Sequence, residues 1–190
     1  LRIAVVGDVD PDPVGLDPTD SIDVLTADLL FDGLTGVDAD GTPVPAVAAR
    51  WTTDDGTTWR FVLDPDRRFS DGSSITAADV VASLTAVIAN RRGNLAAAAL
   101  DVVDGALDVG LGRTDQVRGL SAPDDRTVQV VTTGPYRELP ALLADPAYGI
   151  VGTSAPRTLR PALVTSGRYS VASDHSGSTV LRPADRASAL

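Results

Sequence analysis

Apolar residues near the start of the chain follow first a strand pattern and then a helix pattern. Residues 2–6 form an apolar run that predicts a short buried strand, followed by Gly7 and a loop rich in Asp and Pro. Beyond this loop, apolar residues recur at helical spacing and predict a helix over residues 22–32. Ser21 is the expected cap of this helix, and Gly33 stands where a C-terminal glycine is expected.

The next segment is predicted to contain a short helix and then a hairpin. Pro45 can occupy the first turn of a helix that ends before Trp51. Residues 58–63 are rich in strand formers and should pair back with residues 51–53 across an Asp-Asp-Gly turn. Alternate residues of the second strand then place large apolar side chains on one face, namely Trp59, Phe61 and Leu63.

The strongest helix signal begins at Thr76. The sequence Thr-Ala-Ala-Asp resembles a capping box in which Asp79 takes the place of the usual Glu or Gln. The apolar residues that follow the capping box form one helical stripe: Val80, Val81, Leu84, Val87 and Ile88. A looser helical stretch is expected over residues 95–107.

The second half of the chain carries further hairpin signals. Residues 117–120 and 127–131 should pair through a turn at residues 123–125. Two more short strands are expected at residues 169–172 and 179–181. Helices combined with antiparallel hairpins predict a mixed α+β fold.

Composition limits the size of the fold and the nature of its core. With 190 residues and 43% hydrophobic content, the chain can build one full core, or one domain and part of another. Aromatic residues make up only 4%, so the core must be mainly aliphatic and offers few stacking surfaces. No apolar run approaches the roughly 18 residues that indicate a membrane span, and the first residues lack a signal-peptide layout.

Charge and missing residue types exclude several classes of function. A formal net charge of −10 argues against a nucleic-acid partner, because that affinity comes from clustered cations. The absence of Lys excludes a phosphate-binding loop of the Walker type. The absence of Cys excludes disulfides, thiolate metal sites and a cysteine nucleophile.

Candidate catalytic groups have a simpler structural interpretation. The only histidine, His175, lies in the Ser- and Gly-rich stretch 173–178, which is typical of a hairpin turn and lacks the strand-to-helix elbow of a nucleophilic serine. The paired carboxylates at 54–55 and 124–125 lie in predicted turns, where Asp serves the backbone. We therefore expect no catalytic residue, no enzyme activity and no cofactor.

A calcium loop is the remaining metal hypothesis. Asp8, Asp10 and Asp12 have the alternating spacing of such a loop. Pro13, however, occupies the place of the required Gly, and Thr19 that of the bidentate Glu. We therefore expect no metal site.

A series of motifs along the chain is more informative than any single residue. The most specific run is Phe69-Ser70-Asp71-Gly72, followed by Thr76-Ala77-Ala78-Asp79-Val80 and Ser83-Leu84. Other motifs occur in this order: Leu16-Asp17-Pro18, Leu30-Phe31-Asp32-Gly33-Leu34, Pro45 to Trp51, Thr58 to Leu63, Ala122 to Val128 and Thr165-Ser166-Gly167-Arg168-Tyr169. Together they resemble the family 5 extracellular solute-binding proteins, the binding components of oligopeptide, dipeptide and nickel importers.

The resemblance implies a specific architecture. The chain would form the first lobe and small subdomain of a two-lobed, periplasmic-binding-protein type II-like fold. Residues 1–34 would supply the first strand and helix of that lobe, residues 35–160 the small α+β subdomain, and residues 161–190 the strands that return to the lobe. The second lobe would lie outside this chain, so the chain alone should bind a solute weakly or not at all.

The resemblance also implies a function. The protein would be the extracellular binding component of an ABC importer, capturing peptides or similar small solutes and delivering them to a membrane permease. We expect a monomer, either extracellular or attached to the cell envelope. The family suggests solute contacts from the loop after the first strand and from the start of the Ala-rich stretch: Gly7, Asp8, Val9, Asp10, Asn94, Ala97 and Ala98.

The alternative is a non-transporting envelope or sensor protein that uses the same fold to contact a protein or glycolipid. The Ala-rich stretch 94–99 favours this alternative, since peptide binders often place an aromatic residue there.

Overall fold

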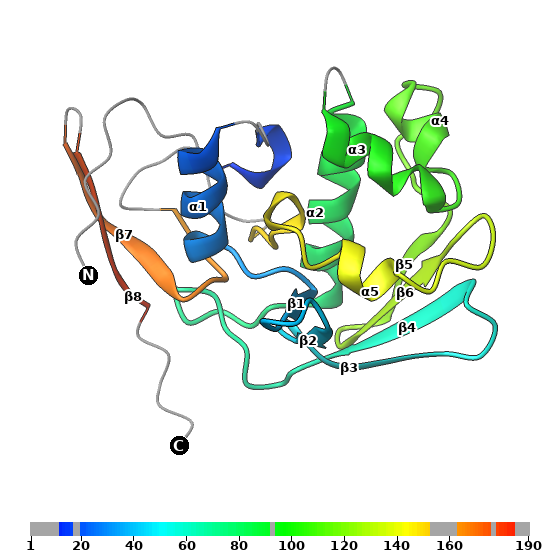
Figure 1. The fold of residues 1–190 in the computed structure, drawn as a ribbon, viewed down its shortest axis with the longest axis horizontal. Helices are drawn as coiled ribbons and strands as arrows, with labels where there is room; N and C mark the ends of the chain where they lie inside the picture. The colour runs from blue at the N-terminus through cyan, green and yellow to red at the C-terminus, as the bar shows by residue number, and fades with distance from the viewer. Residues whose placement is uncertain (1–11, 17–19, 92–93, 153–162, 176–177, 185–190) are drawn as a thin grey trace.

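The computed structural model describes residues 12–16, 20–91, 94–152, 163–175 and 178–184 (Figure 1). Within these ranges helices pack against antiparallel sheets, which confirms the α+β class. The strand expected at residues 2–6 lies outside the described residues. No helix in the described part of the chain is long and apolar enough to cross a membrane.

A four-stranded antiparallel sheet forms one side of the main core. Its strands are β3 (Ala48–Thr53), β4 (Thr58–Leu63), β5 (Leu120–Asp124) and β6 (Thr127–Val131), in the order β3-β4-β6-β5. The expected pairing of β3 with β4 is confirmed, with Trp51 opposite Phe61. Trp59, Phe61 and Leu63 are all buried on one face, as their alternation predicted. The sheet therefore presents an apolar face to the helices.

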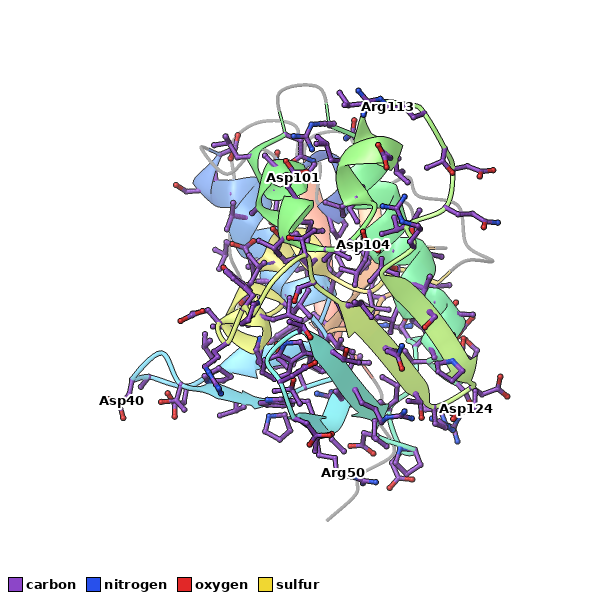
Figure 2. The ribbon with its side chains drawn as sticks, turned by 90° about the vertical axis from the view of Figure 1, so that its right-hand side faces the viewer. Asp40, Arg50, Asp101, Asp104, Arg113 and Asp124 are labelled. Carbon is purple, nitrogen blue, oxygen red and sulfur yellow. The ribbon has the colours of Figure 1, made fainter. Side chains whose placement is uncertain are left out.

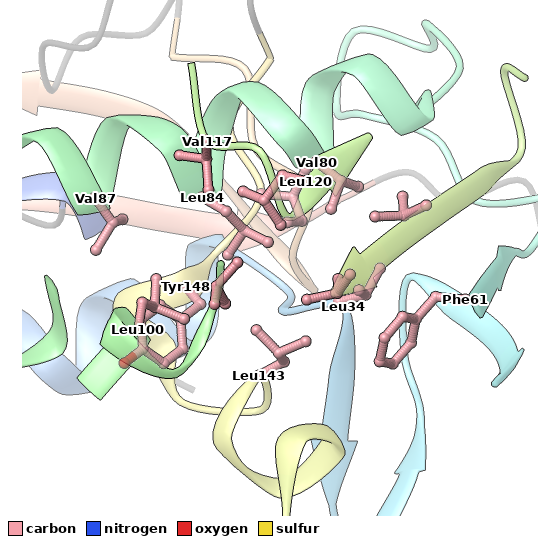
Figure 3. Packing of buried hydrophobic residues seen from close by; sticks show 14 of the residues in the cluster. Leu34, Phe61, Val80, Leu84, Val87, Leu100, Val117, Leu120, Leu143 and Tyr148 are labelled. Carbon is pink, nitrogen blue, oxygen red and sulfur yellow. The ribbon is translucent and has the colours of Figure 1, made fainter. Parts of the chain in front are cut away.

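The long helix α2 (Ala77–Ala89) packs against β5 and β6 and forms the other side of this core. Its capping box is confirmed: the Asp79 amide donates to Thr76 Oγ1 over 3.3 Å, and the Thr76 amide donates to Asp79 Oδ2 over 3.0 Å. Val81 of the predicted stripe is only partly buried. The four other members are fully buried: Val80, Leu84, Val87 and Ile88. Figure 3 shows the first three of these facing the core.

The helical stretch expected over residues 95–107 is broken into three short pieces. These are α3 (Leu95–Ala99), η2 (Leu100–Val102) and α4 (Ala106–Gly110). Gly105 interrupts the stretch with a φ of +80°, and a Cβ there would lie 2.9 Å from the backbone nitrogen of Arg118. Only glycine fits this left-handed, closely packed position, so a continuous helix was the wrong prediction.

The helix predicted to start at Pro45 is also wrong. Pro45 ends β2 (Pro43–Pro45), which pairs with β1 (Thr35–Val37) in a two-stranded antiparallel sheet. Proline is tolerated at a sheet edge because the missing N–H faces away from the ladder. Strand β3 begins at Ala48, three residues after Pro45, and the Ala48 amide donates to the Leu34 carbonyl over 2.8 Å.

Two boundaries near the first helix differ from the prediction. Helix α1 spans Ser21–Leu30, and its cap is Asp20, whose carboxylate accepts from two amides of the first turn. Gly33 does not adopt a left-handed conformation. A Cβ on Gly33 would instead lie 2.6 Å from the Leu143 carbonyl oxygen, so this glycine allows close approach of two chain segments.

The hairpin of β5 and β6 is shifted from its expected position. Strand β6 matches the prediction, but β5 begins at Leu120 rather than at residue 117. Its pairing is irregular between Ser121 and Asp124, where Pro123 lies in the edge strand. The turn is consequently at residues 125–126, because an irregular edge strand accommodates the proline that suggested an earlier turn.

The last elements complete the described fold. They are α5 (Leu139–Leu142), η3 (Pro146–Tyr148), the hairpin of β7 (Tyr169–His175) with β8 (Ser178–Pro183), and the early turn η1 (Pro13–Gly15). The two strands expected at residues 169–172 and 179–181 are therefore confirmed and are longer than expected. Figure 1 shows β7 and β8 beyond α1, on the side away from the four-stranded sheet. A second apolar cluster joins this hairpin to α1: Leu30, Phe31, Val151, Leu163 and Val171.

Candidate functional site

The early turn η1 meets the ends of two helices at one backbone carbonyl. The carbonyl oxygen of Val14 accepts hydrogen bonds from Asn90 Nδ2 at 2.7 Å and from Asn94 Nδ2 at 3.1 Å. Asn90 is the C-cap of α2 and Asn94 is the N-cap of α3. The segment that follows the N-terminal loop is thus joined to the start of the Ala-rich stretch, 80 residues away in sequence.

Asn94 uses both ends of its carboxamide. Its Oδ1 accepts from the amides of Ala96 at 3.0 Å and Ala97 at 3.3 Å, and so caps α3. The Nδ2 group is then directed toward Val14, whose carbonyl can only accept. The orientation of this side chain is therefore determined by its partners on both sides.

Tyr148 makes a further hydrogen bond to α3. Its hydroxyl donates to the Ala96 carbonyl over 2.9 Å. Burial of the side chain, together with the nearby Asp145 carboxylate, raises the pKa of Tyr148 above its usual value. The hydroxyl therefore stays protonated and remains a donor throughout the physiological range.

The candidate binding residues fall into three groups. Gly7, Asp8, Val9 and Asp10 lie outside the described residues. Asn94 is partly buried and Ala98 is exposed. Ala97 has 0% of its surface exposed and belongs to the main apolar cluster.

Asn90 was missed by the sequence analysis. Its role depends on Val14, 76 residues earlier, and no local pattern connects the two. The only available signal was a polar residue directly after the apolar stripe of α2, which is also typical of an ordinary helix end.

A second junction connects the sheet side of the fold to the return hairpin. Ser166 Oγ donates to the Ile150 carbonyl over 2.6 Å, and the Asp32 amide donates to the same hydroxyl over 3.1 Å. Nearby, the Gly167 amide donates to the Leu30 carbonyl over 2.8 Å. The motifs around residues 30–34 and 165–169 are therefore parts of one contact.

The turn motifs have an architectural role. Phe69 is buried, and the Asp71 carboxylate accepts from the amide and hydroxyl of Ser73. Gly72 adopts a φ of +85°, which the turn requires. The hydrogen bonds from Ser73 lower the pKa of Asp71, as expected for a carboxylate that is held in its charged form.

The charged side chains of the described residues do not gather into a metal-binding cluster. Among the described residues there is no group of three or more potential metal ligands, and no buried polar side-chain atom lacks a hydrogen-bond partner. Asp12 accepts from the Val14 amide at 3.0 Å. In the view of Figure 2, Asp40, Arg50, Arg113 and Asp124 lie at the outer edge, whereas Asp101 and Asp104 lie nearer the middle.

Several surface charges form ion pairs near α3 and α4. Arg91 pairs with Asp101, and Arg118 bridges Asp104 and Asp108. Hydrogen bonds from Arg113 and Arg118 lower the pKa of Asp108. Asp108 is therefore held in its ionised form by these two cations. His175 ends β7, and its side chain lies outside what the structure describes.

A helix-covered antiparallel sheet joined to a separate return hairpin is the architecture of the first part of a periplasmic-binding-protein type II fold. The chain belongs to the bacterial extracellular solute-binding proteins, family 5, whose model matches residues 42–185.

Named relatives agree with this family. The periplasmic oligopeptide-binding protein OppA of Escherichia coli K12 is 31% identical over 153 residues, which is 75% of this chain and 28% of that protein. The structure of OppA from Burkholderia pseudomallei matches with a TM-score of 0.83 and 27% identity, covering 96% of this chain and 38% of that one. The Escherichia coli murein tripeptide binding protein MppA gives a TM-score of 0.84 at 25% identity, over 97% of this chain and 37% of that one.

The chain spans little more than a quarter of the length of the curated OppA relative. It spans less than two fifths of the two solved structures. The similarity therefore describes one part of a longer architecture.

Proposed function

We propose that this chain is the first part of the extracellular binding component of an ABC importer for peptides or similar small solutes. The observation that carries the proposal is the match of nearly the whole described fold to OppA from Burkholderia pseudomallei, at 27% identity and a TM-score of 0.83. The oligopeptide-binding relative from Escherichia coli supports the same solute class at 31% identity.

The proposed division of the chain has residues 1–34 and 161–190 in the first lobe and residues 35–160 in a small subdomain. Two apolar clusters support it. One contains residues from Leu34 to Ile150, and the other joins Leu30 and Phe31 to Val171. The opposite wall of the solute cleft would come from a second lobe outside these 190 residues.

The proposed solute contacts come from the loop at Gly7, Asp8, Val9 and Asp10 and from the segment that begins at Asn94. Within that segment Ala98 offers an exposed surface. Binding would use main-chain groups and closure around the solute, without covalent chemistry. The proposed setting is extracellular or attached to the envelope, where a monomer would deliver its solute to a membrane permease.

Calorimetric titration tests this function. The complete natural protein that contains this chain is titrated with libraries of di-, tri- and tetrapeptides, and the 190-residue chain alone serves as the matched control. We expect binding by the complete protein and an affinity at least about 100-fold weaker for the chain alone, because one wall of the cleft is missing. If the complete protein shows neither heat nor a thermal shift with any library, peptide capture is wrong.

A further inference from the structure

The Val14 carbonyl has two side-chain donors, both from helix ends. Asn90 and Asn94 come from the end of α2 and the start of α3 and lie 2.7 Å and 3.1 Å from this oxygen. A carbonyl oxygen has two acceptor lone pairs, so both are used. The end of α2 and the start of α3 are consequently both hydrogen-bonded to the same atom of the early turn η1.

The rest of the early turn is also held. The Val14 amide donates to Asp12 Oδ1 over 3.0 Å, and the Gly15 amide donates to the Asp12 carbonyl over 3.1 Å. On the outer side of the turn, a Cβ on Gly149 would lie 3.1 Å from Pro13 Cγ. The turn is thus packed against η3 on one side and bonded to α2 and α3 on the other.

The contact at the Val14 carbonyl lies close in sequence to both of the proposed solute-contact segments. Val14 lies four residues after Asp10, the last of the proposed contacts in the N-terminal loop. Asn94 lies four residues before Ala98, the exposed position of the second proposed contact segment. The Val14 carbonyl therefore links the two segments through two side chains.

We propose that Asn90 and Asn94 are positioning residues for solute binding, which act by fixing the turn at Val14. This inference rests on the proposed function. Each carboxamide donates to the Val14 carbonyl and so fixes the position of the turn η1 relative to α3. Preorganised contact segments bind more tightly, because less ordering is needed when the solute arrives.

Nearly isosteric variants test this role in the complete protein. Asn94→Asp keeps the oxygen that caps α3, since Asp caps helices as well as Asn, but it removes the Nδ2 donor. Asn90→Asp removes the other donor. We expect the double variant to bind a tripeptide library about tenfold more weakly than wild type, as two hydrogen bonds are lost. The exposed single variant Asn90→Ala leaves one bond, and the expected loss is about threefold.

Hydrogen exchange provides a readout that is independent of the solute. In the double variant the amides of Gly15 and Leu16 should exchange faster, whereas the amides of the central strands β4 and β6 should not change. Thr35→Val is the matched control, because it removes a different buried hydrogen bond, from the Thr35 hydroxyl to the carbonyl of Pro140, 105 residues later in the sequence. We expect this control to lower stability and to leave tripeptide affinity unchanged.

The outcomes separate the two proposals. If wild type binds tripeptides and the double variant binds equally well, the positioning role is wrong while the proposed function stands. If Thr35→Val weakens binding as much as the double variant does, the effect is one of general stability and the positioning role is again wrong. If wild type binds none of the di-, tri- and tetrapeptide libraries, both the proposed function and the positioning role fail.

Discussion

The carboxylate of Asp32 lies 2.9 Å from the guanidinium of Arg67, with only 15% and 20% of the two side chains exposed. Arg67 also donates from Nε to the Ala46 carbonyl over 2.9 Å. Asp32 follows α1, and Arg67 follows β4, so the pair joins two parts of the chain that lie far apart in sequence. Its low exposure distinguishes it from the ion pairs of Arg113 and Arg118 on the surface.

Arg67→Met should destabilise the fold. Removing one partner of a fully buried pair costs about 3–5 kcal/mol, and the partial exposure here lowers the expected loss to about 2 kcal/mol. Urea denaturation followed by the fluorescence of Trp51 and Trp59 measures it. Arg68→Met is the control, since Arg68 is exposed and should change the free energy of unfolding by about 0.5 kcal/mol or less. If the two variants lose the same free energy of unfolding, the ion pair of Asp32 and Arg67 does not stabilise the fold.

Gly167 is expected to be intolerant of any side chain. A Cβ there would lie 2.5 Å from the Leu30 carbonyl carbon and 2.6 Å from the Phe31 amide nitrogen. Because these are backbone atoms that cannot rotate away, Gly167→Ala should cost about 3 kcal/mol or prevent docking of the return hairpin. Thermal denaturation of the variant, compared with wild type, measures the effect.

The control for this glycine is Gly134→Ala. A Cβ on Gly134 would meet no atom within 4 Å, and its φ is not positive. Alanine at such a position restricts the unfolded chain and should stabilise the protein by about 0.4–1 kcal/mol. If Gly167→Ala is tolerated as well as Gly134→Ala, the close contact with Leu30 and Phe31 is wrong.

Local signals explain which parts of the fold could be predicted. The capping box of α2 and the β3–β4 hairpin each need residues only a few positions apart, and both are confirmed. Pro45 misled the prediction because proline fits the first turn of a helix and a sheet edge equally well. Its partner strand, β1, contains only three residues and carries too weak a pattern to decide between them.

The site could be predicted only in part. Its two contact segments came from the family resemblance, but the bond between Asn94 and Val14 spans 80 residues and has no sequence signature. Burial was equally invisible: Ala97 and Ala98 are chemically identical neighbours, and only the packed structure shows that one is buried and the other exposed. Motifs such as Thr165 to Tyr169 were recognised without their partners.

Asp55 should make the β3–β4 hairpin resistant to acid. Hydrogen bonds from the Thr57 hydroxyl and from the amides of Thr58 and Thr57 hold the pKa of Asp55 well below its usual range. A depressed folded-state pKa contributes stability that is present above the unfolded-state value and lost as the pH falls through the folded-state value. The contribution should therefore persist in mild acid.

Thr57→Val removes the largest cause of this shift. We expect the carboxyl pKa of Asp55, followed by NMR titration, to rise toward its ordinary value, and the midpoint of acid unfolding to move to higher pH. Thr53→Val is a comparison within the same turn, because its hydroxyl contacts Asp55 only at 3.5 Å. An unchanged Asp55 titration in Thr57→Val would contradict the assigned cause.

Ala97 and Ala98 offer a direct comparison between packing and solute contact. Ala97→Leu adds three carbons to a fully buried position and should cost about 1–3 kcal/mol through overpacking. Ala98→Leu adds the same atoms to an exposed position of the same short helix, so stability should change by about 0.5 kcal/mol or less. Urea denaturation measures this difference in stability. Peptide titration of the complete protein should show the larger change in affinity for Ala98→Leu, because its side chain projects from the proposed contact segment. An exposed leucine that leaves peptide affinity unchanged would place the solute away from α3.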